Sequence, residues 1–499
     1  MRKTPLLATI AIGIAASLAL AGCSGASSSA SGGADASIAV GSLYEPVNLD
    51  NTAGGGQGVT EALNGNVYEG LFKLTDDGKV EPLLATKYTT SADGLTYTFT
   101  LRDGVKFHSG KPLTSESVKT SIERVLADDS QSARKSQLAV ISGIKTPDDK
   151  TVVISLKSRS ISLPYNLSYV WIYGPGVKNY KTAEDGTGPY TLGTWKRGSS
   201  LSLERWSGYW GAKAKNKEVV YDYFTDASAL SNALLTNQVD IVTSIQSPDS
   251  LTQFEGNKDY TISNGKSTTK ELLAFNDKVA PFNNVDVRKA VYSAIDTKKL
   301  LSSIWGKYGT LIGSMVPPSD PWYEDLTKVN PYDTALAKKE LAAAGLPNGF
   351  TFTLDTPTYD PHPAVAEFLK SELAKVGVTV NINSISADQW YTKVFKNHDF
   401  TATLQEHVND RDVVWYGNPD FYWGYDNPQV TAWVNEAEQA STTAEQTAKL
   451  KQVNEQIAKD AASAWLYLYP QIVVASSSLS GYPVNGLNSQ FYAYDIVKK

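Results

Sequence analysis

The spacing of hydrophobic residues along the chain follows two different periods. Between the Asp-Gly pairs at 93–94 and 103–104, Tyr97, Phe99 and Leu101 alternate with threonines. Alternation with a period of two between such turns predicts an antiparallel hairpin with one buried face. Because another Asp-Gly pair lies at 77–78, we expect the stretch 68–107 to be rich in hairpins.

A helical period appears in several later segments. One predicted helix follows Thr114 or Ser115, either of which can cap it, and a second is opened by Asp286. A third begins near Pro363, ends at Gly377 and is followed at once by a strand with Val378, Val380 and Ile382 in alternate positions; a long fourth helix begins near Thr442. A helix, a glycine and a strand in succession are typical of α/β architecture.

The amino terminus has the layout of a secretory signal. Arg2 and Lys3 precede an apolar stretch over 6–21, and the segment ends in Leu20-Ala21-Gly22-Cys23, which resembles the bacterial lipobox. We expect a signal over 1–22, a lipid on Cys23 and a flexible tether over 23–37, where small and polar residues show no periodicity. The alternative is an uncleaved membrane anchor with an incidental cysteine.

Composition excludes several functions. The 499 residues include 46 Lys and Arg against 52 Asp and Glu, and the net charge of −6 argues against a nucleic-acid partner. A single cysteine cannot form an internal disulfide, and the four histidines lack the spacing of a metal motif. No hydrolase motif such as G-x-S-x-G or H-E-x-x-H occurs. We therefore expect no enzyme activity, no cofactor and no resident metal.

A series of short motifs follows the tether in a fixed order. They include Asn66–Leu71, Leu101–Gly110, Gly186–Tyr190, Asn237–Ile241, Val287–Ala290 and Gly424–Pro428. Taken together, over nearly all of the chain after the tether, they resemble the family 5 extracellular solute-binding proteins, the peptide- and nickel-type receptors of ABC importers. Most of these motifs set turns or pack in the core, so they indicate the family rather than the site.

The resemblance implies a two-lobed α/β fold of the periplasmic-binding-protein type, with an extra hairpin-rich subdomain and a ligand cleft between the lobes. Chain crossovers near 265 and 470 would form the hinge. The implied division is lobe I over 37–73, 188–265 and 471–499, an inserted subdomain over 74–187, and lobe II over 266–470.

The resemblance also implies the site. Asp410 corresponds best to the acidic residue that, in relatives, binds the ammonium group of a peptide, and Asp412 and Glu406 are the alternatives. His407 stands where relatives have a tryptophan. Tyr359 belongs to a Tyr-x-Pro element that lacks the preceding arginine of dipeptide-selective relatives, which favours longer peptides or a ligand without a free carboxylate. Further aromatic residues are expected at the cleft or its rim: Tyr44, Trp171, Trp390, Trp415, Tyr422 and Trp423.

We therefore expect a monomeric receptor, lipid-anchored on the outer face of the cell membrane, that delivers a peptide-like solute to an ABC permease. Oligosaccharides and metal chelates are the alternative ligands. A surface-anchored hydrolase, or an adhesion or signalling protein with the same fold, are the alternative functions.

Overall fold

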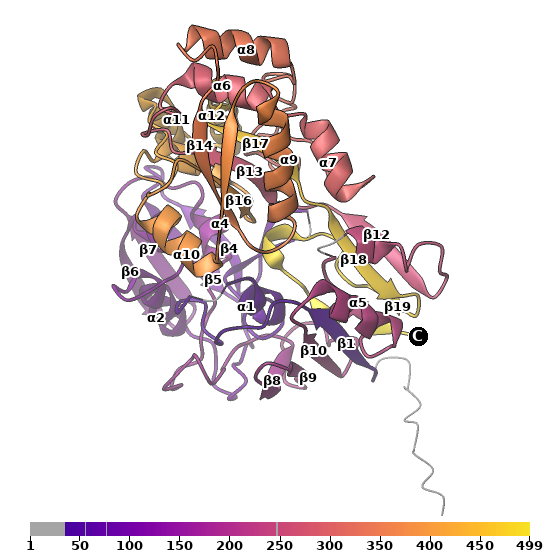
Figure 1. Cartoon of the computed structure of the whole chain (residues 1–499). Coiled ribbons are helices and arrows are strands. Elements are labelled where there is room, and N and C mark those ends of the chain that lie inside the picture. The colour runs from indigo at the N-terminus through magenta and orange to yellow at the C-terminus, as the bar shows by residue number, and fades with distance from the viewer. Residues whose placement is uncertain (1–34, 55, 76, 246–247) are drawn as a thin grey trace, which may run out of the picture. The chain divides into compact units, whose positions relative to one another are not determined.

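The computed structural model describes residues 35–54, 56–75, 77–245 and 248–499. The predicted signal, Cys23 and most of the predicted tether lie outside these residues. Three larger β-sheets organise the described chain, and each is covered by helices (Figure 1).

The seven-stranded sheet defines lobe I. Its order is β12-β18-β11-β1-β10-β9-β8, and the central pairs β1–β10 and β1–β11 are parallel. Ile38 and Val40 of β1 are fully buried in its core. Its elements are β1 (Ser37–Ser42), α1 (Gly56–Leu63), β8 (Tyr190–Lys196), β9 (Ser200–Arg205), β10 (Glu218–Tyr223), α5 (Ala227–Leu235), β11 (Ile241–Val242), β12 (Tyr260–Gly265) and β18 (Gln471–Ser476).

A four-stranded antiparallel sheet, β4-β5-β7-β6, defines the subdomain. Tyr97, Phe99 and Leu101 of β5 point into its core, which confirms the hairpin that their alternation predicts. Thr114 caps the helix α2, since its hydroxyl accepts a hydrogen bond from the amide of Ser117. The elements are β4 (Ala85–Thr90), β5 (Thr96–Leu101), α2 (Ser115–Leu126), α3 (Lys135–Leu138), β6 (Ile141–Asp148), β7 (Thr151–Leu156) and α4 (Leu163–Leu167).

The five-stranded sheet β15-β14-β16-β13-β17 defines lobe II. The predicted helix–glycine–strand unit is α9 followed by β15, and α9 packs on β15 and β14 (Figure 1). The strands are β13 (Lys270–Phe275), β14 (Thr351–Pro357), β15 (Thr379–Ile385), β16 (Ala402–His407) and β17 (Ser463–Leu468). The helices are α6 (Val285–Ser293), α7 (Thr297–Trp305), α8 (Thr334–Ala343), α9 (His362–Ala374), α10 (Ala387–Trp390), α11 (Pro428–Glu438) and α12 (Thr443–Lys459).

Two helix starts show how local chemistry sets the boundaries. Thr442 and Glu445 form a capping box at the start of α12, close to the predicted position. The helix predicted to open at Asp286 begins earlier, because the side chain of Asn284 accepts a hydrogen bond from the Asp286 amide and caps α6 there.

Shorter elements complete the fold: β2 (Phe72–Leu74), β3 (Val80–Pro82), β19 (Leu479–Ser480) and β20 (Val497–Lys498).

The chain passes between the lobe I and lobe II sheets at two crossovers. Residues 266–269 join β12 to β13, and residues 469–470 join β17 to β18. The crossovers lie side by side, since the amide of Tyr469 donates a hydrogen bond of 2.9 Å to the carbonyl oxygen of Thr269. A change in the angle between the two sheets would have to be absorbed in these few residues.

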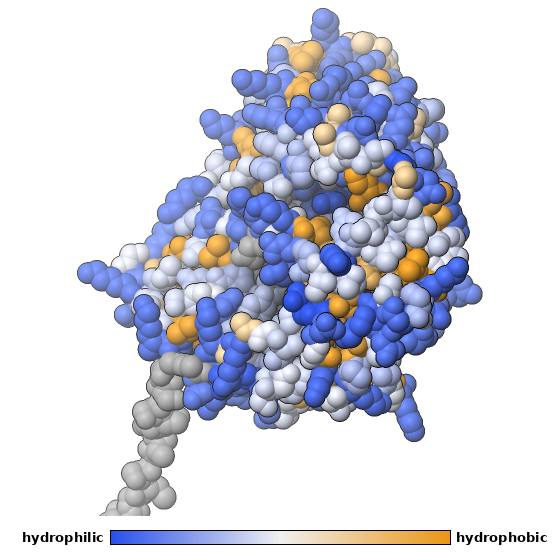
Figure 2. Space-filling view, turned by 180° about the vertical axis from the view of Figure 1, so that it is seen from behind, coloured by the Kyte–Doolittle hydropathy of each residue, from blue (hydrophilic) through white to orange (hydrophobic). Residues whose placement is uncertain are grey.

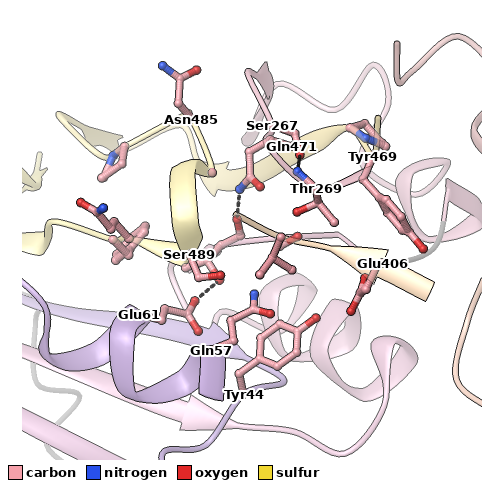
Figure 3. A pocket seen from close by; sticks show the side chains of 18 residues that line it. Tyr44, Gln57, Glu61, Ser267, Thr269, Glu406, Tyr469, Gln471, Asn485 and Ser489 are labelled. Atoms are coloured by element: carbon pink, nitrogen blue, oxygen red, sulfur yellow. Dashed lines mark hydrogen bonds between the residues drawn. The ribbon is translucent and has the colours of Figure 1, made fainter. Parts of the chain in front are cut away.

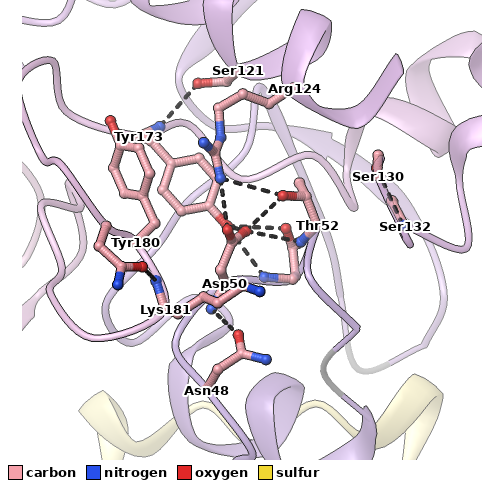
Figure 4. A network of polar contacts seen from close by, with 12 residues as sticks. Asn48, Asp50, Thr52, Ser121, Arg124, Ser130, Ser132, Tyr173, Tyr180 and Lys181 are labelled. Atoms are coloured by element: carbon pink, nitrogen blue, oxygen red, sulfur yellow. Dashed lines mark hydrogen bonds and ion pairs between the residues drawn. The ribbon is translucent and has the colours of Figure 1, made fainter. Parts of the chain in front are cut away.

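A buried polar network fixes the loop between β1 and α1 to the subdomain (Figure 4). Arg124 of α2 donates to the Asp50 carboxylate at 2.7 Å, and its guanidinium lies over the rings of Tyr173 and Tyr180 at 4.9 and 4.3 Å. Asp50 also accepts hydrogen bonds from the hydroxyl and amide of Thr52. The loop that follows Tyr44 is therefore attached to the subdomain through Asp50.

The surface is mainly hydrophilic on the face shown in Figure 2, where hydrophobic residues lie in small separate groups. Within the residues that the structure describes, none of the helices is both long enough and apolar enough to cross a membrane.

Candidate functional site

A polar pocket lies where the two lobes meet at the crossovers (Figure 3). We call it the cleft pocket. Its volume is about 60 Å³, which is room for a few water molecules. Its lining combines lobe I, lobe II and both crossovers: Tyr44, Gln57, Glu61, Thr243, Ser244, Ser267, Thr269, Glu406, Val408, Tyr469, Pro470, Gln471, Pro483, Asn485, Gly486, Ser489, Gln490 and Phe491.

Two carboxylates from opposite lobes line this pocket. Glu61 of α1 accepts hydrogen bonds from the hydroxyls of Ser42 and Thr243, and burial raises its pKa. Glu406 of β16 forms no hydrogen bond or ion pair within the described part of the chain, although His362 and Glu271 act on it electrostatically. Burial raises the pKa of Glu406 to about 7, and the charge of Glu271 adds to the rise while His362 opposes it.

A third carboxylate belongs to the residue that pairs with Glu406 across the lobe II sheet. Glu271 of β13 is the direct antiparallel partner of Glu406, so both side chains leave the same face of the sheet. Glu271 is fully buried and accepts a hydrogen bond from Tyr469, while its Oε1 has no partner among the described residues. Burial raises the pKa of Glu271 to about 8. Like charges directly opposite each other destabilise a sheet, so this pair favours a proton or a cation between or beside its members.

The neighbours of the pair do not neutralise it. His362 of α9 is fully buried, its Nε2 lies 3.5 Å from Oε2 of Glu271, and burial lowers its pKa, which favours the uncharged imidazole. No lysine or arginine is among the residues that line the cleft pocket. A carboxylate without a hydrogen-bond partner, in a pocket with a second carboxylate and no fixed cation, is suited to hold an ammonium group.

Asp412 and His407 from the predicted anchor segment do not line the cleft pocket. Asp412 is buried and bonds the Nζ atom of Lys270 at 3.0 Å, and Nδ1 of His407 lies 3.6 Å from it. Burial acts to raise the pKa of Asp412, but Lys270 and His407 outweigh burial and lower it. Asp412 is therefore already paired within the protein.

Asp410, the first choice for the ammonium anchor, contacts the subdomain. Its carboxylate accepts a hydrogen bond from Tyr165, lies 3.4 Å from the hydroxyl of Tyr169 and 3.9 Å from Nε of Arg411. Asp410 and Asp412 line a second, larger cavity between the subdomain and lobe II. Of the three predicted acidic residues, Glu406 alone lines the cleft pocket.

The predicted aromatic residues fall into different surroundings. Tyr44 lines the cleft pocket, Trp415 lines the larger cavity, and Tyr359 is 40% exposed with its ring 4.7 Å from that of His362. The others pack inside the lobes: Trp171 stacks on Tyr68 in lobe I, Trp390 donates to Thr403, Tyr422 bonds Nε2 of His407, and Trp423 stacks on Tyr416.

Sequence reasoning missed Glu61, Glu271, His362 and Tyr469. One signal was present, because Lys270 and Glu271 are charged residues that open an otherwise apolar strand, LLAF. Charged residues in such a strand are buried only when something pairs with them. No group of three or more His, Cys, Asp or Glu side chains is placed to hold a metal ion within 35–54, 56–75, 77–245 and 248–499.

Two lobes joined by paired crossovers, with a pocket at the junction, define a ligand-binding protein of the two-lobed periplasmic type. Residues 79–412 match the family model described as bacterial extracellular solute-binding proteins, family 5 Middle. The chain belongs to this family.

Several known proteins resemble this chain in sequence or in fold. The glutathione-binding protein GsiB of Salmonella typhimurium is 30% identical over 376 residues, which cover 71% of this chain and 70% of the relative. The protein of the same name from Pectobacterium atrosepticum is 28% identical and covers 90% of this chain and 91% of the relative. A solved structure of the ABC transporter substrate binding protein CtaP from Listeria monocytogenes aligns with a TM-score of 0.82 at 22% identity, covering 93% of this chain and 99% of that one.

Proposed function

We propose that this chain is the solute receptor of an ABC importer and that it binds peptide-like solutes, longer than dipeptides, between its lobes, with the ammonium group of the solute in the cleft pocket. The observation that carries the proposal is the position of Glu406. It is a lobe II carboxylate without a hydrogen-bond partner among the described residues, and it lines a pocket shared with Tyr44 and Glu61 of lobe I. An ammonium group bound there would contact both lobes at once.

The lobes would close around a solute because the bound solute contacts both of them. A solute in the pocket would also touch both crossovers, through Ser267 and Thr269 on one and Tyr469 on the other. A ligand shifts a conformational equilibrium only by its differential affinity for the two states. Contacts that exist only when the lobes are together would therefore stabilise the closed form, which would be the form that docks on the permease.

The printed names of similar proteins support a peptide-like ligand. The relatives include glutathione-binding proteins, and structures with the same fold include one in complex with the peptide STSA and one with a nonapeptide. Each of these ligands carries an amino group, which the acidic pocket of this chain would accept. The absence of an arginine before Tyr359 supports solutes longer than a dipeptide.

We also propose the boundaries of the lobes, a monomeric state and a location at the cell membrane. We assign 37–73, 188–265 and 471–499 to lobe I, 74–187 to the subdomain and 266–470 to lobe II. The receptor is a monomer, held on the outer face of the cell membrane by a lipid on Cys23. The basis for the lipid is the lipobox-like sequence that ends at Cys23.

The test is calorimetric titration of the purified receptor with tetra-alanine, N-acetyl-tetra-alanine, glutathione, maltotriose and a nickel–histidine chelate. We expect micromolar binding of at least one free-amine peptide, and at least tenfold weaker binding of the acetylated form. Glu406→Gln should weaken the free-amine peptide at least tenfold, whereas Glu255→Gln, which breaks an exposed pair with Lys307, should not. Binding of maltotriose or the chelate alone would overturn the proposal.

A further inference from the structure

The largest cavity among the pockets described here lies between the subdomain and lobe II. Its volume is about 390 Å³, within the range of small-molecule sites, whereas the cleft pocket holds about 60 Å³. Subdomain residues 133–140 and 158–166 form one wall, and residues 409–418 with parts of α11 and α12 form the other. The wall includes an apolar group: Val140, Val414, Trp415, Val434 and Leu450.

Arg134 lines this cavity with a guanidinium that makes no hydrogen bond among the described residues. Its guanidinium lies 3.7 Å over the ring of Tyr169 and 5.3 Å from that of Tyr165. Within the described residues, no hydrogen bond or ion pair engages the guanidinium, although Asp410 acts on it electrostatically. An arginine that stacks on a ring by its face keeps the N–H donors of its edge for another group.

The other arginines of the cavity are already engaged. Arg159 donates to the carbonyl oxygens of Asp93 and Ala92. Arg411 lies 3.6 Å over Tyr165, with its Nε atom 3.9 Å from the Asp410 carboxylate. Arg134 is thus the arginine of this cavity whose guanidinium has neither a hydrogen bond nor an ion pair among the described residues.

The acidic residues of the cavity are also engaged. Asp412 pairs with Lys270, and Asp410 accepts a hydrogen bond from Tyr165. Glu438 accepts hydrogen bonds from Ser160 and Ser162. Because the carboxylates are paired and one guanidinium is not, the cavity favours an anion, and a carboxylate matches the planar fork of arginine.

We propose that this cavity receives a carboxylate-bearing, partly apolar portion of the solute, with Arg134 as the partner of the carboxylate. This inference rests on the proposed function, which places the ammonium group at Glu406. Val408 lines the cleft pocket and Asn409 lines the cavity, so the two spaces border adjacent residues, and the proposed solute would extend from one space to the other along this segment. The solute is then a zwitterion that spans the segment 406–412.

The first test compares peptides with and without a carboxylate. The probes are Ala-Ala-Phe, Ala-Ala-Ala-Phe and Ala-Ala-Ala-Ala-Phe, each as the free acid and as the C-terminal amide, titrated calorimetrically at pH 7.5. We expect at least one free acid to bind tenfold or more tightly than its amide. Arg134→Gln should bring the two within about twofold, and Arg134→Lys should retain part of the preference.

The matched control is Arg197→Gln. Arg197 also stacks on an aromatic ring, at 3.5 Å over Trp195, but it lies outside both pockets. Its variant should keep the full preference for the acid. Equal binding of acid and amide by the wild-type protein would overturn the inference while leaving the peptide receptor in place, and so would an undiminished preference in Arg134→Gln.

A second probe separates this inference from the proposed function. 2-Naphthoate carries an apolar ring and a carboxylate, and 2-naphthamide is its neutral counterpart. Saturation-transfer NMR should show binding of naphthoate, weaker binding of naphthamide, and at least fivefold weaker naphthoate binding to Arg134→Gln. If no peptide binds but this pattern holds, the peptide function fails and the anion cavity stands. If naphthoate binding is unaffected by Arg134→Gln, the cavity assignment fails.

Discussion

The hydroxyl group of Tyr165 in the subdomain donates a hydrogen bond to the carboxylate of Asp410 in lobe II. Beside this contact, the backbone amide of Ile161 donates to the carbonyl oxygen of Glu438 at 2.9 Å. These bonds connect the subdomain to lobe II without passing through the cleft pocket. Lobe II is therefore connected to the rest of the described chain at a second place besides the crossovers, and we call this place the second seam.

Tyr165→Phe should loosen the seam. Removing the donor leaves the buried Asp410 carboxylate less well bonded, at a cost of about 1–3 kcal/mol. We expect the ligand-free variant to have a larger radius of gyration by small-angle X-ray scattering, because the open arrangement gains population. Tyr180→Phe is the control, since the Tyr180 hydroxyl bonds Gly174 within the same subdomain. An equal radius for both variants would contradict a role for Tyr165 in closure.

The Glu271–Glu406 pair should make stability depend on pH. Their pKa values of about 8 and about 7 lie above the ordinary 4.5 of glutamate, so the folded protein holds protons that the unfolded chain releases. Their contribution to the free energy of unfolding is fully present below about pH 4.5 and is lost as the pH rises to about 8. Urea unfolding at pH 5, 6, 7 and 8 measures this slope.

Glu271→Gln is the variant that tests the assignment. An uncharged amide at this position titrates no proton, so the slope between pH 5 and 8 should become shallower. The exposed Glu367, which forms a surface pair with Lys370, supplies the control Glu367→Gln, whose slope should equal that of the wild type. A wild-type slope in Glu271→Gln would show that other groups cause the pH dependence.

Binding of a cationic solute should depend on pH in the opposite direction. An ammonium group favours the ionised carboxylates, so affinity should rise between pH 5.5 and 8, by up to about tenfold per pH unit for each proton released. Calorimetry in buffers of different ionisation enthalpy should detect protons released on binding near pH 7. Affinity that falls across this range would contradict an ammonium site at Glu406.

Removing one member of the buried Lys270–Asp412 pair should destabilise the protein more than removing both members. Lys270→Met leaves the Asp412 carboxylate buried without its main partner, which should cost about 3–5 kcal/mol of the free energy of unfolding. The double change Lys270→Met with Asp412→Leu should regain most of this loss, because no charge is then left uncompensated. Urea unfolding of the single and double variants measures both effects, and equal stability of the two would show that the pair is not coupled.

Cys23→Ser should release the receptor from the membrane. The proposed lipid is attached to the Cys23 thiol, which serine lacks, so the variant should appear in the soluble fraction of the cell envelope or in the medium. Fractionation of cells that express each form, with mass spectrometry of the native amino-terminal peptide, measures the outcome. An unmodified Cys23 in membrane-extracted wild-type protein would contradict the anchor.

The class of fold was predictable because the local sequence signals of this chain favour the same helices and strands that its tertiary structure contains. The alternation around Phe99 and the glycine at 377 specify a hairpin and the end of a helix wherever they occur. The ordered motifs then identified the family. The packing of Trp171, a subdomain residue, against the core of lobe I was not predictable, because an aromatic residue suits a cleft rim and a core equally well.

The acidic pair could not be read from sequence. Glu271 and Glu406 lie on strands that are distant in the chain, and they face each other only through the register of β13 and β16. A shift of one residue would point one of them to the other face of the sheet. The pairing of Asp412 with Lys270 is of the same kind, and it is the reason that the acidic residues of one short segment serve different purposes.

The most direct measurement is equilibrium dialysis of the purified receptor against a defined mixture of di- to hexapeptides, with the retained solutes identified by mass spectrometry. We expect retention, at close to one peptide per chain, of peptides of three or more residues with a free amino terminus, and loss of this retention in Glu406→Gln. Retention of no peptide above the level of a protein-free control would contradict it. So would undiminished retention by Glu406→Gln.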